Sequence, residues 1–351
     1  MHVHVDELLK RAAEQNASDL HLTVGSTPIC RIDSKLIPYE DSPLTAEEMK
    51  KFTEEILNEA DRQTLYKVGE IDTSYQIGNS LRFRINAYFQ KNFITIAARV
   101  IPTRIPTLEE LSMPLILKKL AMRKQGLILV TGPTGSGKST TLAAMLDLIN
   151  TSMSKHIITL EDPIEYIHDH KQSVVHQREI GHDTRSFANA LRASLRQDPD
   201  VILVGEMRDL ETISTAITAA ETGHLVLATL HTNGAAQTIN RIIDVFPANQ
   251  QPQIRIQLAD FLQGIISQQL LPRKDGKGRI ATTEILVNQP GVANLIRNAK
   301  IDQIANIMQT SRSSGMHLME MSIQELMTKN MIDQDVADMY MNDAGGFNAS
   351  L

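Results

Sequence analysis

One glycine-rich segment constrains the fold of this chain more than any other feature. It reads Gly132-Pro133-Thr134-Gly135-Ser136-Gly137-Lys138-Ser139-Thr140. An apolar run, residues 127–130, precedes it, and residues 140–150 are compatible with a helix. Strand, glycine loop and helix in this order are the context of a phosphate-binding P-loop, because backbone N–H groups and the helix start point at phosphate oxygens. We predict a nucleotide site, with Lys138 on the β- and γ-phosphates and Ser139 on Mg²⁺.

The composition excludes several other classes of protein. The 351 residues are 42% hydrophobic and 22% charged, as in a globular protein, and the net charge of −6 gives no overall attraction to nucleic acid or anionic membrane. The single cysteine, Cys30, excludes an internal disulfide and a cysteine-rich zinc site, and we expect it in the core. No apolar run reaches the roughly 18 residues of a transmembrane helix, and no signal segment opens the chain, so we expect a cytoplasmic protein.

A proline-containing linker divides the chain. Residues 101–107 suit neither a helix nor a sheet interior, because prolines stand at two of the positions. Residues 1–100 before it alternate between helix and strand patterns and predict a small α+β domain. Residues 108–289 after it contain short, fully apolar runs separated by helices, which predict an α/β domain with a parallel sheet covered on both faces. Residues 290–351 predict a helical region.

The small domain contains two clear local patterns. Thr45 with Glu48 three residues on is a capping box, and the helix that it opens is expected to run to about Tyr66. Residues 81–89 alternate strictly between polar and apolar side chains, and residues 93–100 follow as a partner strand.

Two acidic stretches follow buried strands beyond the P-loop. Glu161, Asp162 and Glu165 come just after residues 157–160, where ligands bind in open α/β sheets. A carboxylate there can hold Mg²⁺ or polarise water, although a polar turn is an equally good interpretation. The second apolar run ends in Glu206 and resembles a Walker B strand, with Glu in place of the usual Asp.

A histidine ends a third buried strand. Residues 225–230 are apolar apart from one threonine, and His231 follows them. Because the other strand ends point to the same edge, we predict that His231 senses the γ-phosphate. His224, just before the strand, has no assigned role. The basic turn at residues 272–279 is predicted to be a solvated hairpin tip rather than a phosphate site.

These four stretches, in chain order, resemble the Walker A, Asp box, Walker B and His box of the secretion-superfamily motor ATPases. They are most similar to those of the type IV pilus retraction ATPases, the PilT family. The resemblance continues through residues 174–181 and 191–200 and through residues 17–22 near the N-terminus, so it covers nearly the whole chain. It implies a PAS-like N-terminal domain, a RecA-like ATPase domain and a ring hexamer that binds ATP and Mg²⁺ between subunits.

The resemblance also implies roles for individual residues. Glu165 would be the catalytic glutamate that activates water, and Glu206 would serve Mg²⁺. Arg84 and Arg99 match the family's arginines that reach bound nucleotide, and as arginine fingers they would stabilise charge on the γ-phosphate. Rotation about the linker at residues 101–107 would then move the ring. By resemblance the partner is the inner-membrane pilus platform protein, so the location is peripheral to that membrane.

Two features bear on the direction of pilus movement. Extension and type II secretion ATPases commonly carry a four-cysteine zinc site and a longer N-terminal region, so this chain resembles the retraction branch. That branch carries the motif Ala-Ile-Arg-Asn-Leu-Ile-Arg, which corresponds to residues 291–297, with Ala293 in place of the first arginine. A PilU-like accessory ATPase of low turnover, working beside a paralogous retraction ATPase, is one alternative. A secretion or DNA-uptake motor is another, but no basic stripe with interleaved aromatics indicates direct nucleic-acid binding.

Overall fold

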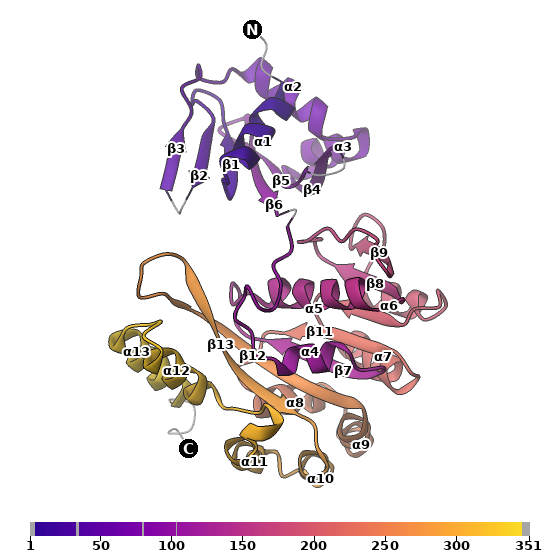
Figure 1. Ribbon diagram of the computed structural model, residues 1–351. Coiled ribbons are helices and arrows are strands. Elements are labelled where there is room, and N and C mark those ends of the chain that lie inside the picture. The colour runs from indigo at the N-terminus through magenta and orange to yellow at the C-terminus, as the bar shows by residue number, and fades with distance from the viewer. Residues whose placement is uncertain (1–3, 33–34, 79–80, 103, 346–351) are drawn as a thin grey trace. The chain divides into compact units, whose positions relative to one another are not determined.

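The computed structural model describes the chain except for residues 1–3, 33–34, 79–80, 103 and 346–351, with the side chains of residues 342–345 also outside the description. The chain forms two compact units (Figure 1). Unit 1 comprises residues 1–104 with 165–167, and unit 2 comprises residues 105–164 with 168–351. Within the described ranges, no helix is both long and apolar enough to cross a membrane.

Unit 1 is built on an antiparallel sheet of six strands in the order β3-β2-β1-β6-β5-β4. Its core includes the fully buried Phe52, Leu65, Phe83 and the predicted core cysteine, Cys30. The elements are α1 (Val5–Glu14), β1 (Asp19–Leu22), β2 (Ile29–Ile32), β3 (Lys35–Pro38), α2 (Ala46–Ile56), α3 (Glu59–Val68), β4 (Glu70–Ile77), β5 (Leu81–Gln90) and β6 (Phe93–Ile101). The alternation at residues 81–89 therefore predicts β5 correctly.

The predicted single helix from Thr45 to about Tyr66 is wrong, because the structure has two helices there. The capping box is present: the Thr45 side chain accepts a hydrogen bond from the Glu48 backbone N–H. Leu57, however, is extended, and Asn58 caps the second helix by accepting from the Asp61 N–H at 2.9 Å. An asparagine that offers its side chain to the backbone competes with continuation of the first helix.

Unit 2 is built on a seven-stranded sheet in the order β13-β12-β7-β11-β10-β8-β9. All neighbours are parallel except the β12–β13 hairpin, so the predicted parallel sheet is confirmed. Its elements are α4 (Ile116–Ala121), β7 (Gly126–Thr131), α5 (Lys138–Ser152), β8 (His156–Glu161), β9 (Val174–Glu179), α6 (Phe187–Ser194), β10 (Val201–Val204), α7 (Leu210–Glu221), β11 (Leu225–Leu230), α8 (Ala235–Asp244), α9 (Gln251–Phe261), β12 (Leu262–Pro272), β13 (Arg279–Val287), α10 (Pro290–Arg297), α11 (Ile304–Thr310), α12 (Met319–Thr328) and α13 (Gln334–Gly345).

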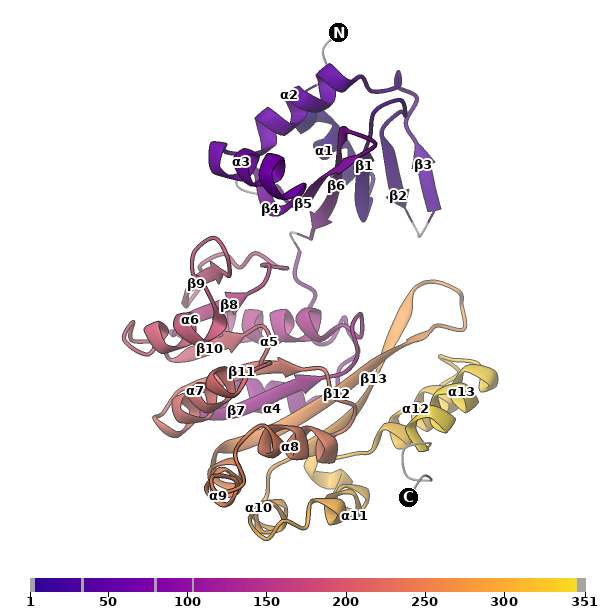
Figure 2. The same ribbon diagram turned by 180° about the vertical axis from the view of Figure 1, so that it is seen from behind.

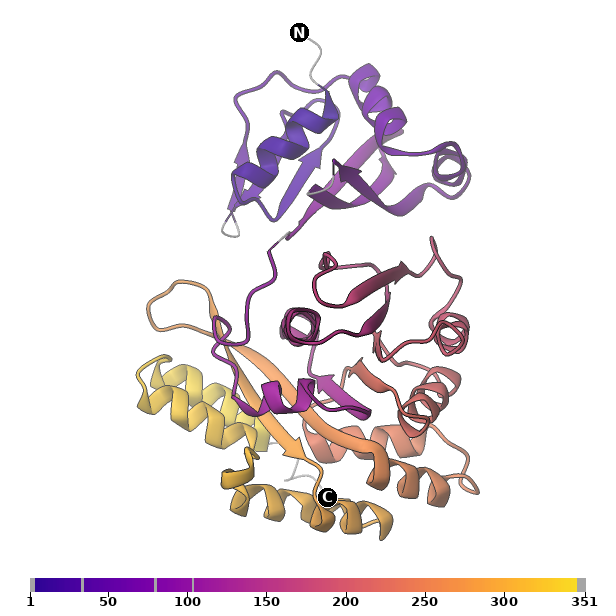
Figure 3. The ribbon, with the colours of Figure 1, turned by 45° about the vertical axis from the view of Figure 1, so that its right-hand side comes forward.

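Helices cover both faces of this sheet. Helix α4 crosses the face seen in Figure 1, and α8 crosses the opposite face, seen in Figure 2. The helical C-terminal region continues along the β12–β13 hairpin, with α12 and α13 beside it (Figure 3). Apolar strands β7, β10 and β11 are fully buried between these layers, as their sequences predict.

We expect Thr45→Ala to loosen the start of α2. The loss of a capping box costs about 1 kcal/mol, which corresponds to roughly fivefold faster amide hydrogen exchange in the first turn of that helix. Thr64→Ala is the matched control, because the Thr64 hydroxyl donates to the Ala60 carbonyl within α3 and caps nothing. Equal exchange rates in α2 for both variants would contradict the assignment.

Candidate active site

The P-loop, Glu206 and His231 lie at one edge of the unit 2 sheet. Leu230 of β11 pairs with Thr131 of β7, so His231 and Gly132 leave the sheet at the same level. Strand β10 runs parallel beside β11 and leads into Glu206. Carboxyl ends of parallel strands form the usual ligand-binding edge of an open α/β sheet. The structure therefore brings together three of the sequence-predicted features.

The P-loop joins β7 to α5 and wraps around the Lys138 side chain. The Lys138 ammonium donates to the carbonyls of Gly132 at 2.8 Å and Pro133 at 3.0 Å, and the side chain is buried within the loop. Gly137 caps α5 with a φ of 87°, in the left-handed region that favours glycine. The helix start directs its backbone N–H groups toward the loop, so this geometry suits a chain of phosphates.

Gln268 on β12 is a site residue that the sequence did not reveal. Its buried amide donates to the Ser136 carbonyl at 2.7 Å and accepts from the Thr141 hydroxyl at 2.7 Å. The side chain thus ties the loop to the first turn of α5. Gly132 permits this approach, because a Cβ there would lie 2.2 Å from the Gln268 backbone oxygen. A glutamine in the segment before the basic turn, for which the sequence analysis assigned no strand, carries no local signal of this role.

Glu206 follows β10 at this edge of the sheet and pairs with two basic side chains. Its carboxylate lies 2.6 Å from Arg208 Nη2 and 3.2 Å from His231 Nε2. Burial raises the pKa of the Glu206 carboxyl, but the hydrogen bond from Arg208 and the charge of His231 outweigh it and hold that pKa below the usual range. Glu206 is therefore ionised and suited to serve a cation. Asp209, in contrast, caps α7 by accepting from the Thr212 N–H.

The Asp box supplies carboxylates with different surroundings. Glu161 ends β8 and accepts hydrogen bonds from the Thr159 hydroxyl at 2.6 Å and the Gln177 amide at 3.1 Å, so it orders the strand end. Glu165 is exposed and belongs to residues 165–167, which group with unit 1. Its catalytic role is argued from its position in the sequence and stays a prediction.

His224 lies at the opposite end of the sheet from the P-loop. It directly precedes β11, whose first residue pairs with Gly126 at the start of β7, about 20 Å from the strand ends that carry the site. Its Nδ1 lies 2.9 Å from the Ala219 carbonyl at the end of α7. The structure gives His224 a local role at a helix end and separates it from His231.

A cavity of about 400 Å³ adjoins the P-loop within unit 2. Thr140, Thr141 and Gln268 line one side, and Met113 is among the apolar residues of the wall. Arg279 also lines it and lies 3.5 Å from the Gly135 carbonyl of the P-loop. The predicted solvated hairpin tip is confirmed, because residues 272–279 are exposed apart from the half-buried Arg273. Arg279, at the base of the tip, also reaches the P-loop.

The predicted arginine fingers are paired within unit 1. Arg84 and Arg99 lie directly opposite each other on β5 and β6. The Arg99 Nε donates to Asp19 at 2.9 Å, and the Arg84 Nε lies 3.6 Å from Asp72. Such exposed ion pairs contribute about 0–1 kcal/mol, so little free energy holds either guanidinium in place. Their contact with nucleotide stays a prediction.

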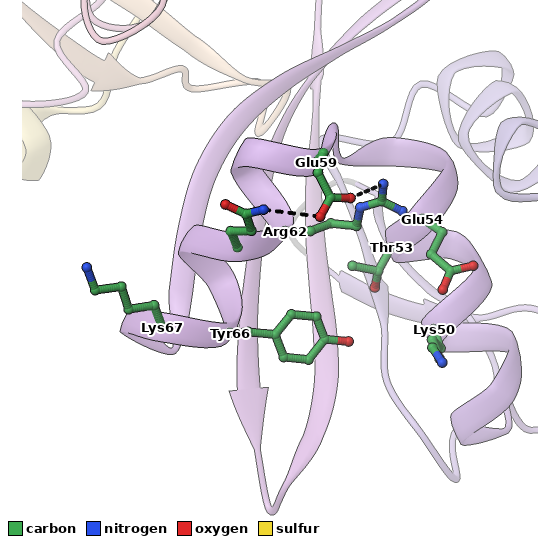
Figure 4. Close-up of a pocket in the computed structure, with 8 residues that line it drawn as sticks. Lys50, Thr53, Glu54, Glu59, Arg62, Tyr66 and Lys67 are labelled. Atoms are coloured by element: carbon green, nitrogen blue, oxygen red, sulfur yellow. Dashed lines mark hydrogen bonds and ion pairs between the residues drawn. The ribbon is translucent and has the colours of Figure 1, made fainter.

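A second cavity, of about 520 Å³, lies in unit 1 between α2 and α3 (Figure 4). Glu59 accepts hydrogen bonds from Arg62 at 2.7 Å and from Gln63 at 3.3 Å, and Tyr66 faces the same opening. The lining carries three basic and two acidic side chains, Lys50, Arg62 and Lys67 with Glu54 and Glu59. None of the predicted site residues lines this cavity.

We expect Gln268→Ala to weaken nucleotide binding. The substitution leaves the Ser136 carbonyl and the Thr141 hydroxyl without their buried partner, at a cost of roughly 1–3 kcal/mol, or about 5- to 150-fold in affinity. Titration with a fluorescent nucleotide would measure it. Gln269→Ala is the matched control, since the neighbouring side chain points to the other face of β12. A loss of affinity equal in both variants would show that Gln268 acts only through strand stability.

The pH dependence of turnover should report Glu206. Activity that needs the carboxylate is lost as pH falls through its pKa, and the lowered pKa places this acid limb below the usual glutamate range. Arg208→Ala removes the hydrogen bond that lowers the pKa, so the limb should move to higher pH. Arg123→Ala, an exposed arginine before β7, is the control. An unmoved limb for Arg208→Ala would mean that another group sets it.

Comparison with known proteins identifies the family. The Type II/IV secretion system protein family matches residues 2–342. The chain is 46% identical over 333 residues to the type IV pilus retraction ATPase PilT of Pseudomonas aeruginosa, covering 95% of this chain and 96% of that protein. It is 42% identical over 339 residues to the type IV pilus ATPase PilU of the same organism, covering 97% and 89%.

A solved structure agrees with these sequence similarities. The crystal structure of the pilus retraction motor PilT with bound ADP matches this fold with a TM-score of 0.90 and 48% identity, over 95% of this chain and 96% of that one. The match extends through both units, so it covers the P-loop edge as well as the small N-terminal sheet. The expected resemblance to pilus retraction ATPases is confirmed, and the chain belongs to the Type II/IV secretion system protein family.

Proposed function

We propose that this chain is an ATP-hydrolysing motor that drives retraction of a type IV pilus, and with it twitching motility. The observation that carries the proposal is the P-loop, Glu206 and His231 at one sheet edge, in a chain similar over 95% of its length to a retraction ATPase. In this proposal the motor is a homohexamer that docks on a pilus platform protein at the inner membrane.

Each group of site residues has a separate role in ATP hydrolysis. The P-loop and Lys138 bind the phosphates, and the cavity beside Thr140 takes the nucleoside. Glu165 accepts a proton from the attacking water, and His231 responds to the γ-phosphate through its contact with Glu206. Arg84 and Arg99, supplied between subunits, stabilise the charge that develops in the transition state.

The same edge suits Mg²⁺. Ser139 at the start of α5 offers a hydroxyl, and Glu206 offers an ionised carboxylate. In the described part of the chain, no group of three or more His, Cys, Asp or Glu side chains could hold a metal alone. Mg²⁺ bound with a nucleotide usually keeps several waters and takes substrate phosphates as further ligands, and it would neutralise charge between the β- and γ-phosphates.

The domain division is part of the proposal. Residues 1–100 form a PAS-like domain, residues 101–107 a hinge, residues 108–289 a RecA-like ATPase core and residues 290–351 a helical region. ATP turnover would change the hinge angle and so move neighbouring subunits against each other. The division of the structure between residues 104 and 105 supports the position of the hinge.

The accessory, PilU-like alternative rests on Ala293. That residue is buried on α10 within the core of unit 2, where a small apolar side chain packs. Packing therefore accounts for the departure from the family motif without any change at the ATP site. The sequence identity to PilT is higher than the identity to PilU, which supports a retraction motor over an accessory ATPase. A secretion or DNA-uptake motor lacks a comparable supporting observation.

Arg84→Ala should lower turnover far more than nucleotide affinity. Arginine fingers contribute about 10³–10⁵ in rate, so steady-state ATPase assays should show a loss of orders of magnitude while ADP binding changes little. Arg82→Ala is a matched control on the same strand, because its side chain donates to the Ser74 hydroxyl within unit 1. A loss of less than about threefold for Arg84→Ala would exclude a finger role.

Turnover per subunit should also rise with protein concentration and then level off, because neighbouring subunits complete each site. Mixing Lys138→Ala protein with Arg84→Ala protein should restore part of the activity if the arginine acts in trans. Sizing the same samples would show whether the ring forms. A rate independent of concentration in samples that are monomeric would contradict the shared site.

A further inference from the structure

Glu284 on β13 caps two helices with one carboxylate. Its Oε1 accepts from the Ala235 N–H at 2.7 Å, and its Oε2 accepts from the Met319 N–H at 3.4 Å. These are the first residues of α8 and α12. Neither preceding residue, Gly234 or Leu318, makes a side-chain cap of its own. Glu284, although it lies on a strand, thus supplies the side-chain acceptor that both helix starts lack.

This arrangement gives both helix starts an acceptor, and their N–H groups partly stabilise the buried carboxylate. The first N–H groups of a helix have no partner within it, and the helix dipole attracts negative charge to that end. Burial raises the pKa of Glu284 above the usual glutamate range, and the nearby Glu320 carboxylate adds to this, while the hydrogen bonds from Ala235 and Met319 only partly oppose it. Displacing either helix start would remove one of the two donors that compensate the burial.

One of the two helices begins at the candidate active site. His231 is followed by three loop residues and then by α8. Ser267, directly opposite Glu284 in the hairpin register, accepts from the Gly234 N–H at 2.9 Å. Ser267 and Glu284 therefore hold consecutive N–H groups of the loop that carries His231.

The other helix belongs to the C-terminal region. Helix α12 lies beside the β12–β13 hairpin (Figure 3). It packs there through Met319 and Ile323, which form a core cluster with Leu271 and Ile280. Just before α12, His317 exchanges backbone hydrogen bonds with Ile285. The start of α12 is thus fixed to β13 next to Glu284.

We propose that Glu284 is a positioning residue that sets His231 against Glu206 and couples the His231 loop to α12. The proposal rests on the proposed function, because it assigns His231 to the nucleotide site. When the loop moves with the nucleotide state, the shared carboxylate changes its bonds to α12. The nucleotide state of the site thereby alters the start of α12, in the helical C-terminal region, through the Glu284 side chain.

Glu284→Gln tests this in the full-length protein. An amide offers only one acceptor oxygen, so one of the two helix starts loses its partner. We expect kcat for ATP hydrolysis to fall about 10- to 100-fold, because a rate change of this size corresponds to the free energy of one hydrogen bond to a charged group. KM should stay within about threefold, because the P-loop is held separately by Gln268. Glu325→Gln is the control: it removes an exposed carboxylate of α12 that pairs with Lys329 and should leave kcat unchanged.

Hydrogen exchange separates positioning from simple destabilisation. In the unaltered chain, amides at the start of α12 should exchange differently with ADP and with a non-hydrolysable ATP analogue, and Glu284→Gln should abolish the difference. Glu284→Asp keeps the charge but shortens the side chain, so we expect a smaller fall in kcat than for Glu284→Gln. It replaces Glu284→Gln in both measurements if that variant does not fold. An unchanged kcat, or a nucleotide-dependent difference at α12 that persists in the variant, would overturn the proposal. If the unaltered chain binds nucleotide without hydrolysing it, the proposed function fails, and the exchange measurement still decides the coupling.

Discussion

The candidate site depends on β12 lying directly against β7. Parallel pairing brings Ser267 to the level of Thr131, just before the P-loop begins. The next residue, Gln268, can then reach the loop and α5, and Gly132 leaves the space that this approach requires. Without this strand, the loop and α5 would lose the two buried hydrogen bonds that Gln268 makes with them.

Neighbouring residues of β12 serve opposite faces of the sheet. Successive side chains of a strand point in opposite directions. Gln268 therefore supports the P-loop on one face, while Ser267, with Glu284 beside it, supports the His231 loop on the other. One strand thus ties together the part of the site that holds phosphate and the part proposed to respond to it.

The sequence predicted the elements whose signals are local. Buried strands β7, β10 and β11 are continuous apolar runs, and the glycines of the P-loop mark their own turn. Strand β9 was missed because it is polar and lies at the sheet edge. Gln268, Glu284 and Arg279 were not assigned to the site because their roles come from contacts with residues more than 30 positions away. The break at Asn58 had a local signal, a capping side chain, that the helical pattern obscured.

Because successive residues of β12 serve opposite faces of the sheet, the number of residues in this strand is more tightly constrained than their identity. A conservative substitution at either residue would weaken one anchor. Inserting or deleting a single residue between Gly264 and Ser267, where the pairing with β7 is regular, would turn the following side chains to the wrong face and remove both anchors together. Natural or engineered variation in length should therefore be confined to the hairpin turn near Gly276, where a longer loop costs little.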